Sequence, residues 1–140
     1  MSGCGENDIR QRPMSMDRQV NLQLDYLLYL PKDYGKVEKQ WPLMIFLHGA
    51  DERGTNLDLI KEYGPAKLAE EGKDLGFIIV SPQCPDGKWW SNCIEKVMAL
   101  IDETCDNYNV DQSRIYLTGL SMGGYGTWAV HRHARSVLQR

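Results

Sequence analysis

The sequence lacks a long apolar run, an excess of one charge and a metal-type spacing of cysteines. No stretch of about 18 apolar residues occurs in the 140 residues, which argues against a transmembrane helix. A formal net charge of −3 gives no reason to expect nucleic acid or an anionic membrane surface as a partner. The four cysteines include no C-x-x-C pair, so no zinc site is expected. With 42% hydrophobic and 25% charged residues, the composition is that of one ordinary globular domain.

The cysteines leave two alternatives open. Cys84 and Cys93 flank a short loop and could form a disulfide in an exported protein, whereas free, partly buried thiols are the favoured interpretation. Cys93 and Cys105 fall on one expected helix, roughly 18 Å apart, which is too far for a disulfide bond.

Residues 1–17 are polar and irregular, and we interpret them as a leader or linker before a domain over residues 18–140. Within them, Ser2-Gly3-Cys4 resembles the end of a bacterial lipobox, although no apolar region precedes it. Either the natural start lies upstream, which implies a periplasmic, secreted or lipid-anchored protein, or the match is a chance one. As written, the chain has no export signal and would be cytoplasmic.

Three runs rich in apolar residues predict buried strands, and the first is continuously apolar, as in a strand that is covered on both faces. They occupy residues 43–47, 77–80 and 114–118, and successive runs begin roughly 35 residues apart, the size of a βαβ unit. We therefore expect three parallel strands joined by right-handed crossovers. Before them, the alternation from Val20 to Tyr26 predicts a half-buried antiparallel strand that continues to Leu30.

Two helices are expected between these strands, which makes the fold class α/β. Residues 65–71 begin with a proline and are followed by Gly72, as in a short helix. The next helix is expected to be capped by Ser91. Its apolar face is formed by Ile94, Val97, Met98, Ile101, Cys105 and Tyr108.

The pentapeptide GLSMG at residues 119–123 fits the Gly-x-Ser-x-Gly nucleophile elbow. It follows an expected strand and precedes a helix-like run over residues 125–130, which is the context that this motif requires. In such a turn the serine has a strained backbone conformation, and the flanking glycines avoid collisions with neighbouring backbone. We therefore predict Ser121 as a nucleophile, the alternative being a glycine-rich turn with an incidental serine.

A second motif, LHGA at residues 47–50, follows the first apolar strand. In enzymes with this elbow, that loop donates one backbone N–H to the oxyanion, and the residue after the nucleophile donates another. We predict Ala50 and Met122 for these roles, with Asp51 as the alternative to Ala50. Gly49 allows the backbone to come close to a substrate carbonyl.

The chain has three histidines, and none is predicted as the base that a serine nucleophile needs. His131 and His133 lie ten and twelve residues beyond Ser121, roughly 15–18 Å along a helix and out of hydrogen-bond reach. His48 lies on the oxyanion loop and is interpreted as structural, with a role as base as the less favoured alternative. No acid is assigned to the site: solvent-exposed or turn-capping positions are expected for Asp102, Asp106 and Asp111.

Three further side chains are candidates for substrate contacts. Trp89 and Trp90 follow the second apolar strand, at the binding edge of an open α/β sheet. They either line a substrate pocket or cover the edge of the sheet. Arg53 either holds a substrate carboxylate or pairs with a neighbouring acid, for which the candidates are Asp51, Glu52 and Asp58.

Several segments together resemble the bacterial polyhydroxybutyrate-depolymerase, feruloyl-esterase and dienelactone-hydrolase-like group of α/β-hydrolases. They are LP at 30–31, LHGA at 47–50, ERG at 52–54, SPQCP at 81–85, WW at 89–90 and GLSMGG at 119–124. The resemblance runs from about residue 20 to Val130. It implies a carboxylic-ester hydrolase with a Ser-Asp-His triad, an acyl-enzyme mechanism, no metal and no cofactor. The substrate would be a small-molecule or polysaccharide-linked ester.

The resemblance also implies that this is the amino-terminal part of an α/β-hydrolase sheet. Its carboxy-terminal strands, with the catalytic acid and histidine, are missing, and the third parallel strand would lie at or near an edge. Self-association through that edge is therefore expected. The chain is then an esterase fragment that is inactive alone, and the basic composition after Val130 favours this interpretation. Three alternatives remain: a non-catalytic α/β binding module, an esterase completed by a second chain, and a serine peptidase of the prolyl-oligopeptidase type.

Overall fold

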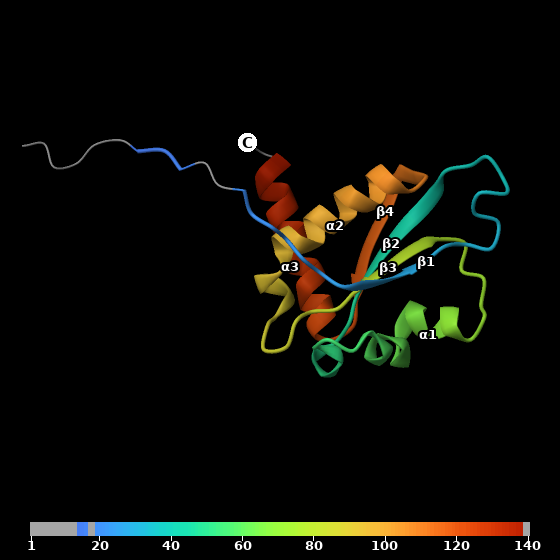
Figure 1. Ribbon diagram of the computed structural model, residues 1–140, viewed down its shortest axis with the longest axis horizontal. Coiled ribbons are helices and arrows are strands. Elements are labelled where there is room, and N and C mark those ends of the chain that lie inside the picture. The colour runs from blue at the N-terminus through green and yellow to red at the C-terminus, as the bar shows by residue number, and fades with distance from the viewer. Residues whose placement is uncertain (1–13, 17–18, 139–140) are drawn as a thin grey trace, which may run out of the picture.

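The computed structural model describes residues 14–16 and 19–138, and Figure 1 shows their arrangement. The strands are β1 (Tyr26–Tyr29), β2 (Trp41–Leu47), β3 (Ile78–Pro82) and β4 (Val110–Gly119). The helices are α1 (Gly64–Glu70), α2 (Ile94–Asn107) and α3 (Met122–Leu138), with short 3₁₀ helices η1 (Ala50–Glu52), η2 (Leu57–Glu62) and η3 (Trp90–Asn92). Most of the expected leader, including Cys4, lies outside the described residues.

The four strands form one mixed sheet in the order β1-β3-β2-β4. β2 runs parallel to both β3 and β4, and β1 pairs antiparallel with β3. The expected α/β class is therefore confirmed, as are the antiparallel first strand and the three parallel strands. Within the described ranges, no helix is long and apolar enough to cross a membrane.

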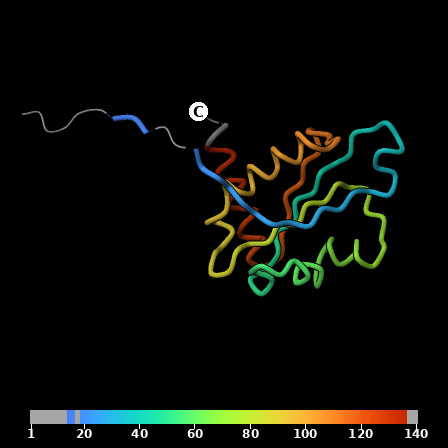
Figure 2. Tube along the Cα trace, in the orientation of Figure 1, coloured from blue at the N-terminus to red at the C-terminus, as the bar shows by residue number. Residues whose placement is uncertain are grey.

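Helices cover both faces of the sheet, as Figures 1 and 2 show. α1 lies on one side, and α2 and α3 lie on the other. The central strands β2 and β3 are buried between these layers, and Leu43, Ile45, Ile78 and Val80 are each 0% exposed. Burial on both faces explains why these strands have continuous apolar sequences rather than an alternating pattern.

The first strand is shorter than its sequence pattern predicts. The alternation predicts a strand from Val20 to Leu30, but β1 covers Tyr26–Tyr29. These four residues are the ones that pair with β3, from Pro82 back to Ile79. Val20 is 74% exposed and has no strand partner among the described residues. An alternating pattern therefore forms a strand here only where another backbone satisfies its hydrogen bonds.

The start of α2 also differs from the prediction. Ser91 is not its cap, because the helix begins at Ile94 and residues 90–92 form the turn η3. Trp90 is 1% exposed, and its indole N–H donates a hydrogen bond to the His48 carbonyl over 2.9 Å. Cys93 is the residue at the N-cap of α2, and its side chain makes no capping hydrogen bond.

β4 is an edge strand and is not covered on both faces. β2 is its neighbour on one side, and no described strand lies on the other side. Tyr116 on this strand is 49% exposed, although its sequence predicts burial. The expectation that this strand lies at an edge is confirmed.

The beginning of β4 contains a bulge that the sequence does not predict. Val110 pairs with Trp41, but Ile115 is the next partner, opposite Leu43. Asp111 holds the extra residues by accepting hydrogen bonds from the amide and hydroxyl of Ser113 and from Arg114 Nε. These hydrogen bonds lower the pKa of the Asp111 carboxyl to about 2. The predicted turn-capping aspartate thus organises a bulge within the strand.

We expect the isolated chain to self-associate through β4. An edge strand carries unpaired backbone groups, and here an apolar hollow adjoins it, lined by Met98, Ile101, Ile115, Leu117 and Trp128. Trp128→Glu charges a side chain that is 66% exposed in this hollow, and it should shift the distribution toward monomer in a sedimentation-velocity dilution series. Val37→Glu, at a 50% exposed residue in the turn before β2, is the matched control and should change nothing. A monomeric unaltered chain at every concentration would contradict this expectation.

Candidate active site

Ser121 lies at the turn between β4 and α3 and has a left-handed backbone conformation. Its φ is 53°, the one positive value at a non-glycine residue in the described part of the chain. Such a conformation costs about 1–2 kcal/mol, so the surrounding turn must enforce it. Leu120 N–H donates to the Leu47 carbonyl over 3.1 Å, and Gly124 N–H donates to the Ser121 carbonyl over 2.9 Å. Ser121 itself remains exposed at the surface.

The glycines of the pentapeptide are required by packing. A Cβ at Gly123 would overlap the carbonyl of Leu47, and a Cβ at Gly119 would overlap the backbone of Gly123. One turn further along α3, a Cβ at Gly126 would collide with Trp90. α3 therefore begins in direct contact with the end of β2, and this contact places Ser121 above the strand ends.

The loop after β2 meets this turn at the same edge of the sheet. β2 and β4 are parallel neighbours that pair to their last residues, Leu47 with Gly119. A Cβ on Gly49 would lie 3.8 Å from the Cβ of Ser121. From this edge the chain leaves β2 toward α1 on one face and leaves β4 toward α3 on the other (Figure 1). Such a divergence marks the position at which open α/β sheets bind ligands.

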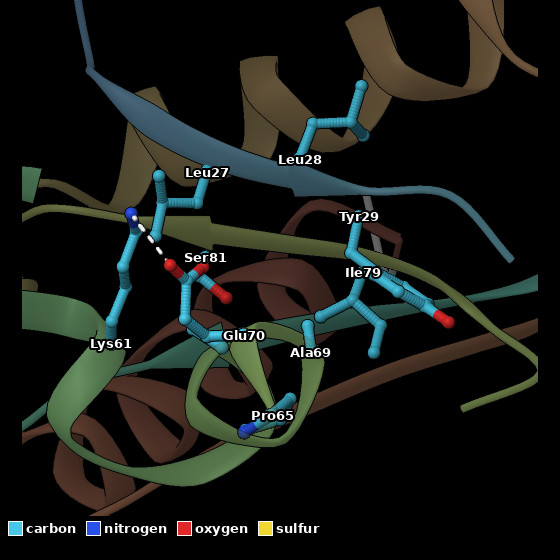
Figure 3. Close-up of a pocket in the computed structure, with 10 residues that line it drawn as sticks. Leu27, Leu28, Tyr29, Lys61, Pro65, Ala69, Glu70, Ile79 and Ser81 are labelled. Carbon is cyan, nitrogen blue, oxygen red and sulfur yellow. Dashed lines mark ion pairs between the residues drawn. The ribbon is translucent and has the colours of Figure 1, made fainter. Parts of the chain in front are cut away.

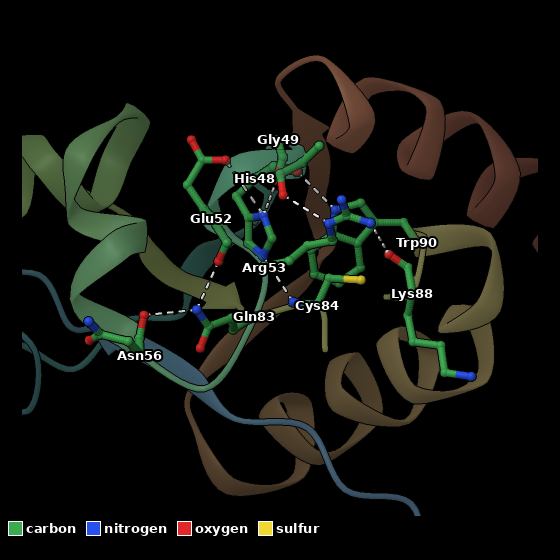
Figure 4. A network of polar contacts seen from close by, with 10 residues as sticks. His48, Gly49, Glu52, Arg53, Asn56, Gln83, Cys84, Lys88 and Trp90 are labelled. Carbon is green, nitrogen blue, oxygen red and sulfur yellow. Dashed lines mark hydrogen bonds and ion pairs between the residues drawn. The ribbon is translucent and has the colours of Figure 1, made fainter. Parts of the chain in front are cut away.

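His48 is buried beneath the loop, with 2% of its surface exposed. Its Nε2 accepts a hydrogen bond from Cys84 N–H over 2.9 Å, and its Nδ1 lies 2.6 Å from the Gly49 carbonyl (Figure 4). The first bond needs a lone pair on Nε2, so Nδ1 carries the proton and donates it to the carbonyl. Burial lowers the pKa of this imidazole and favours the neutral ring. Since both nitrogens are engaged away from Ser121, His48 is a structural residue and not a base.

Arg53 binds backbone carbonyls rather than an acid. Its Nε donates to the Ala50 carbonyl over 2.9 Å, and its Nη1 donates to the Lys88 carbonyl over 3.1 Å. The guanidinium carbon lies 5.6 Å from the centre of the Trp89 ring. The predicted pairing with a neighbouring acid is wrong, because no ion pair joins Arg53 to Asp51, Glu52 or Asp58. Arg53 instead connects η1 to the loop that precedes η3.

The two adjacent tryptophans occupy opposite environments. Trp89 is 53% exposed, whereas Trp90 is 1% exposed. The ring of Trp90 lies 5.0 Å from the imidazole of His48, measured between centroids. This burial corrects the expectation that Trp90 lines a substrate pocket, since its ring belongs to the core. Trp89 keeps an exposed ring next to Arg53.

The remaining histidines lie on α3, away from Ser121. His131 is exposed and His133 is half-buried, and both are ten or more helical residues beyond the serine. That spacing corresponds to about 15 Å or more along the helix axis. Two carboxylates on α2 are exposed, as predicted: Asp102 and Asp106. No group of three potential metal ligands occurs within residues 14–16 and 19–138.

Two buried polar side chains, Gln83 and Glu52, support the loop after β2, and the sequence predicts this role for neither of them. Gln83 is 2% exposed, and its Nε2 donates to the carbonyls of Glu52 and Asn56, each over 2.8 Å (Figure 4). Glu52 folds over Gly49, its Oε2 3.1 Å from where a Cβ would stand. Glu52 Oε2 and Gln83 Oε1 have no hydrogen-bond partner among the described residues. The segments ERG and SPQCP contain these residues, so the family resemblance was the one available signal.

A separate pocket lies between β1, β3 and α1 (Figure 3). Its volume is about 220 Å³, and Leu27, Ile79 and Ala66 form part of its apolar lining. An ion pair of 3.7 Å between Lys61 and Glu70 lies in its wall. Neither Ser121 nor the loop at residues 48–50 lines this pocket, so it is not part of the candidate site.

Comparison with known proteins points to an esterase-related region. No family model matches the sequence. A bifunctional acetylxylan esterase/xylanase from Neocallimastix patriciarum is 32% identical over 102 residues. The alignment covers 69% of this chain and 14% of that protein, so the chain spans a small part of its relative's length. The similarity indicates an esterase-related region, and the assignment of individual residues rests on the geometry above.

We expect Gly123→Ala to destabilise the fold and Gly124→Ala to be tolerated. A Cβ at residue 123 overlaps the Leu47 carbonyl, whereas the nearest atom to a Cβ at residue 124 is the Gly119 carbonyl oxygen at 3.9 Å. The first change should lower the free energy of unfolding by roughly 3 kcal/mol. Gly124→Ala should raise the free energy of unfolding by up to about 1 kcal/mol, because alanine favours a helix more than glycine does. Urea denaturation followed by tryptophan fluorescence measures both, and equal midpoints would contradict the contact between α3 and β2.

Stability should fall as the pH is lowered from about 7 toward 5, because His48 is neutral in the folded state. Burial lowers its folded pKa below the unfolded value of about 6.5, so the unfolded chain binds more protons in this range. Each pH unit below that value should remove up to about 1.4 kcal/mol until the folded pKa is reached. Urea unfolding across this range measures the slope. His48→Gln should abolish this contribution, and the exposed His131→Gln should retain it; identical slopes in the two variants would refute the assignment.

Proposed function

We propose that this chain supplies the nucleophile and the oxyanion-binding backbone of a serine carboxylic-ester hydrolase, of the polyhydroxybutyrate-depolymerase, feruloyl-esterase and dienelactone-hydrolase-like group. The observation that carries the proposal is the φ of 53° at Ser121, in a strand-to-helix turn directly beside Gly49. A strained conformation gives an incidental serine no advantage, but it presents a nucleophile above the sheet. The similarity to an acetylxylan esterase supports the same reaction class.

In the proposed reaction, the Ser121 hydroxyl attacks the ester carbonyl and expels the alcohol, which leaves an acyl-enzyme that water hydrolyses. Negative charge develops on the former carbonyl oxygen in each tetrahedral intermediate. The proposed donors to this oxygen are the backbone N–H groups of Ala50 and Met122. Each is the first residue of a helix, so its N–H has no acceptor within that helix.

His48 sets the direction of one of these donors. The Gly49 carbonyl and the Ala50 N–H belong to one planar trans peptide and therefore point in opposite directions. Because His48 Nδ1 donates to the Gly49 carbonyl over 2.6 Å, the Ala50 N–H points away from the buried imidazole. We assign His48 a positioning role, in which it orients the Ala50 N–H for the substrate oxygen.

The base and its acid are proposed to come from polypeptide outside these 140 residues. His48 has both ring nitrogens engaged, and His131 and His133 are too far along α3 to reach Ser121. The mechanism needs no metal and no cofactor. The proposed substrates are small-molecule or polysaccharide-linked esters, and the exposed ring of Trp89 is the proposed substrate contact.

A non-catalytic α/β module that binds a ligand or partner is the second candidate, and it is favoured because no described histidine is placed to act as the base for Ser121. A peptidase of the prolyl-oligopeptidase type would use the same serine and oxyanion donors. Hydrolysis of a peptide amide that depends on Ser121 would identify the peptidase, because an esterase is expected to cleave only the more reactive ester.

The test compares residues 1–140 with a chain extended past residue 140 in the frame that encodes further Asp and His residues. Without a complete triad, catalysis should not exceed the residual 10³–10⁴-fold over water, so we expect negligible turnover of p-nitrophenyl acetate by residues 1–140. The extended chain should be active, and Ser121→Ala should abolish that activity. Rapid hydrolysis by residues 1–140 that depends on Ser121 would show that a base is present within them.

A binding measurement tests the oxyanion donors without requiring turnover. In the extended chain, where a base is expected to activate Ser121, phenylboronic acid should form a tetrahedral adduct with its hydroxyl and shift the amide resonances of Ala50 and Met122. Ser121→Ala should remove both shifts. Unchanged Ala50 and Met122 resonances in a chain whose Ser121 is modified would favour the non-catalytic alternative.

A further inference from the structure

Two buried cysteines meet beside the candidate site. Cys84 follows β3 and is 0% exposed, and Cys93 precedes α2 and is 2% exposed. Both are free thiols in one buried cluster that also contains Trp90, and the Cys93 side chain lies close enough to the Cys84 thiol to raise its pKa. The fold thus brings together the two ends of the loop at residues 85–92.

The backbone, and not the sulfur atoms, holds each cysteine in place. Cys84 N–H donates to His48 Nε2 over 2.9 Å, and the Cys84 carbonyl accepts from Gly54 N–H over 3.0 Å. Cys93 N–H donates to the Trp90 carbonyl over 2.9 Å. Each sulfur can therefore change its bonding without loss of the contacts that position the residue.

The Cys84 thiol is poorly suited to act as a nucleophile in the folded protein. Burial and the neighbouring Cys93 together raise the pKa of the Cys84 thiol to about 12. The thiolate is the reactive species in exchange with disulfides, so reduced Cys84 should react slowly once the chain is folded. Any bond between these sulfur atoms would have to form while the chain folds.

We infer that Cys84 and Cys93 are a disulfide-forming pair, which becomes linked when the chain folds in the presence of a disulfide donor such as oxidised glutathione. One cysteine thiolate attacks the glutathione disulfide and releases one reduced glutathione, which leaves a mixed disulfide. The second thiolate attacks the cysteine sulfur of that mixed disulfide and releases the second reduced glutathione. The two protein thiols lose two electrons and two protons, and the donor gains them.

The bond would attach the start of α2 to the end of β3 and close the loop that carries Trp89 and Trp90. Arg53 already binds this loop through the Lys88 carbonyl over 3.1 Å. The inference goes beyond the proposed esterase function, since it would hold equally for a non-catalytic module. It also favours the disulfide over the free thiols that the sequence alone suggests.

Peptide mapping tests the inference on the full 140-residue chain. Reduced, denatured chain is refolded in a glutathione redox buffer, remaining thiols are blocked with N-ethylmaleimide, and the product is digested with trypsin without reduction. Cleavage after Lys73, Lys88 and Lys96 leaves Cys84 on residues 74–88 and Cys93 on residues 89–96. We expect these two peptides as one cross-linked mass, and separate maleimide-labelled peptides would overturn the inference.

Two variants and a stability measurement complete the test. Cys105→Ser should leave the cross-linked peptide intact, and Cys93→Ser should remove it. A link from Cys84 to Cys4 or Cys105 in the unaltered chain would overturn the assignment. The oxidised chain should unfold with an equilibrium constant on the order of a hundredfold smaller than that of the reduced chain. A less stable oxidised chain would show that the fold does not accommodate the bond.

Discussion

The carbonyl of Leu47, at the end of β2, is the point on which the geometry of the candidate site depends. It accepts the hydrogen bond from Leu120 N–H over 3.1 Å, which fixes the backbone just before Ser121. Any side chain at residue 123 would overlap this carbonyl, so α3 must begin with glycine in contact with it. The strained φ at Ser121 follows from these two constraints, because the chain has few residues in which to turn from β4 into α3.

Buried polar contacts tie the surrounding loops to β3. His48 is joined to Cys84 N–H, the Gln83 amide reaches the carbonyls of Glu52 and Asn56, and the Trp90 indole binds the His48 carbonyl. Buried polar groups contribute stability mainly when their hydrogen bonds are satisfied, and an unpaired one is costly. This cost favours one arrangement of the loops over the alternatives. A proposed oxyanion site on such loops would be oriented before any substrate binds.

Sequence patterns predict secondary-structure elements best where every residue of the element has the same burial. Continuous apolar runs identified β2 and β3, because both faces of these strands are buried, and the pentapeptide located the turn at Ser121. The patterns failed where a contact with a distant part of the chain determines whether a residue lies in a strand or a helix. The alternation at Val20 has no described strand to pair with, and Trp90 lies in the core against His48 while α2 begins only at Ile94. The roles of Arg53 and Gln83 depend on backbone carbonyls, which the identity of neighbouring residues does not reveal.

The position of the edge strand β4 indicates where a catalytic histidine for Ser121 could be supplied. β4 carries Gly119 at its end, immediately before the turn at Ser121, and no described strand pairs with its outer edge. A strand added parallel to that edge would end at the same side of the sheet as β2 and β4. The loop after it would then lie next to Ser121, since carboxyl ends of parallel strands share one edge. The exposed edge and the base that we propose to come from outside these residues are compatible with one cause: an element that paired with β4 could bring a histidine to the serine and also cover the apolar hollow.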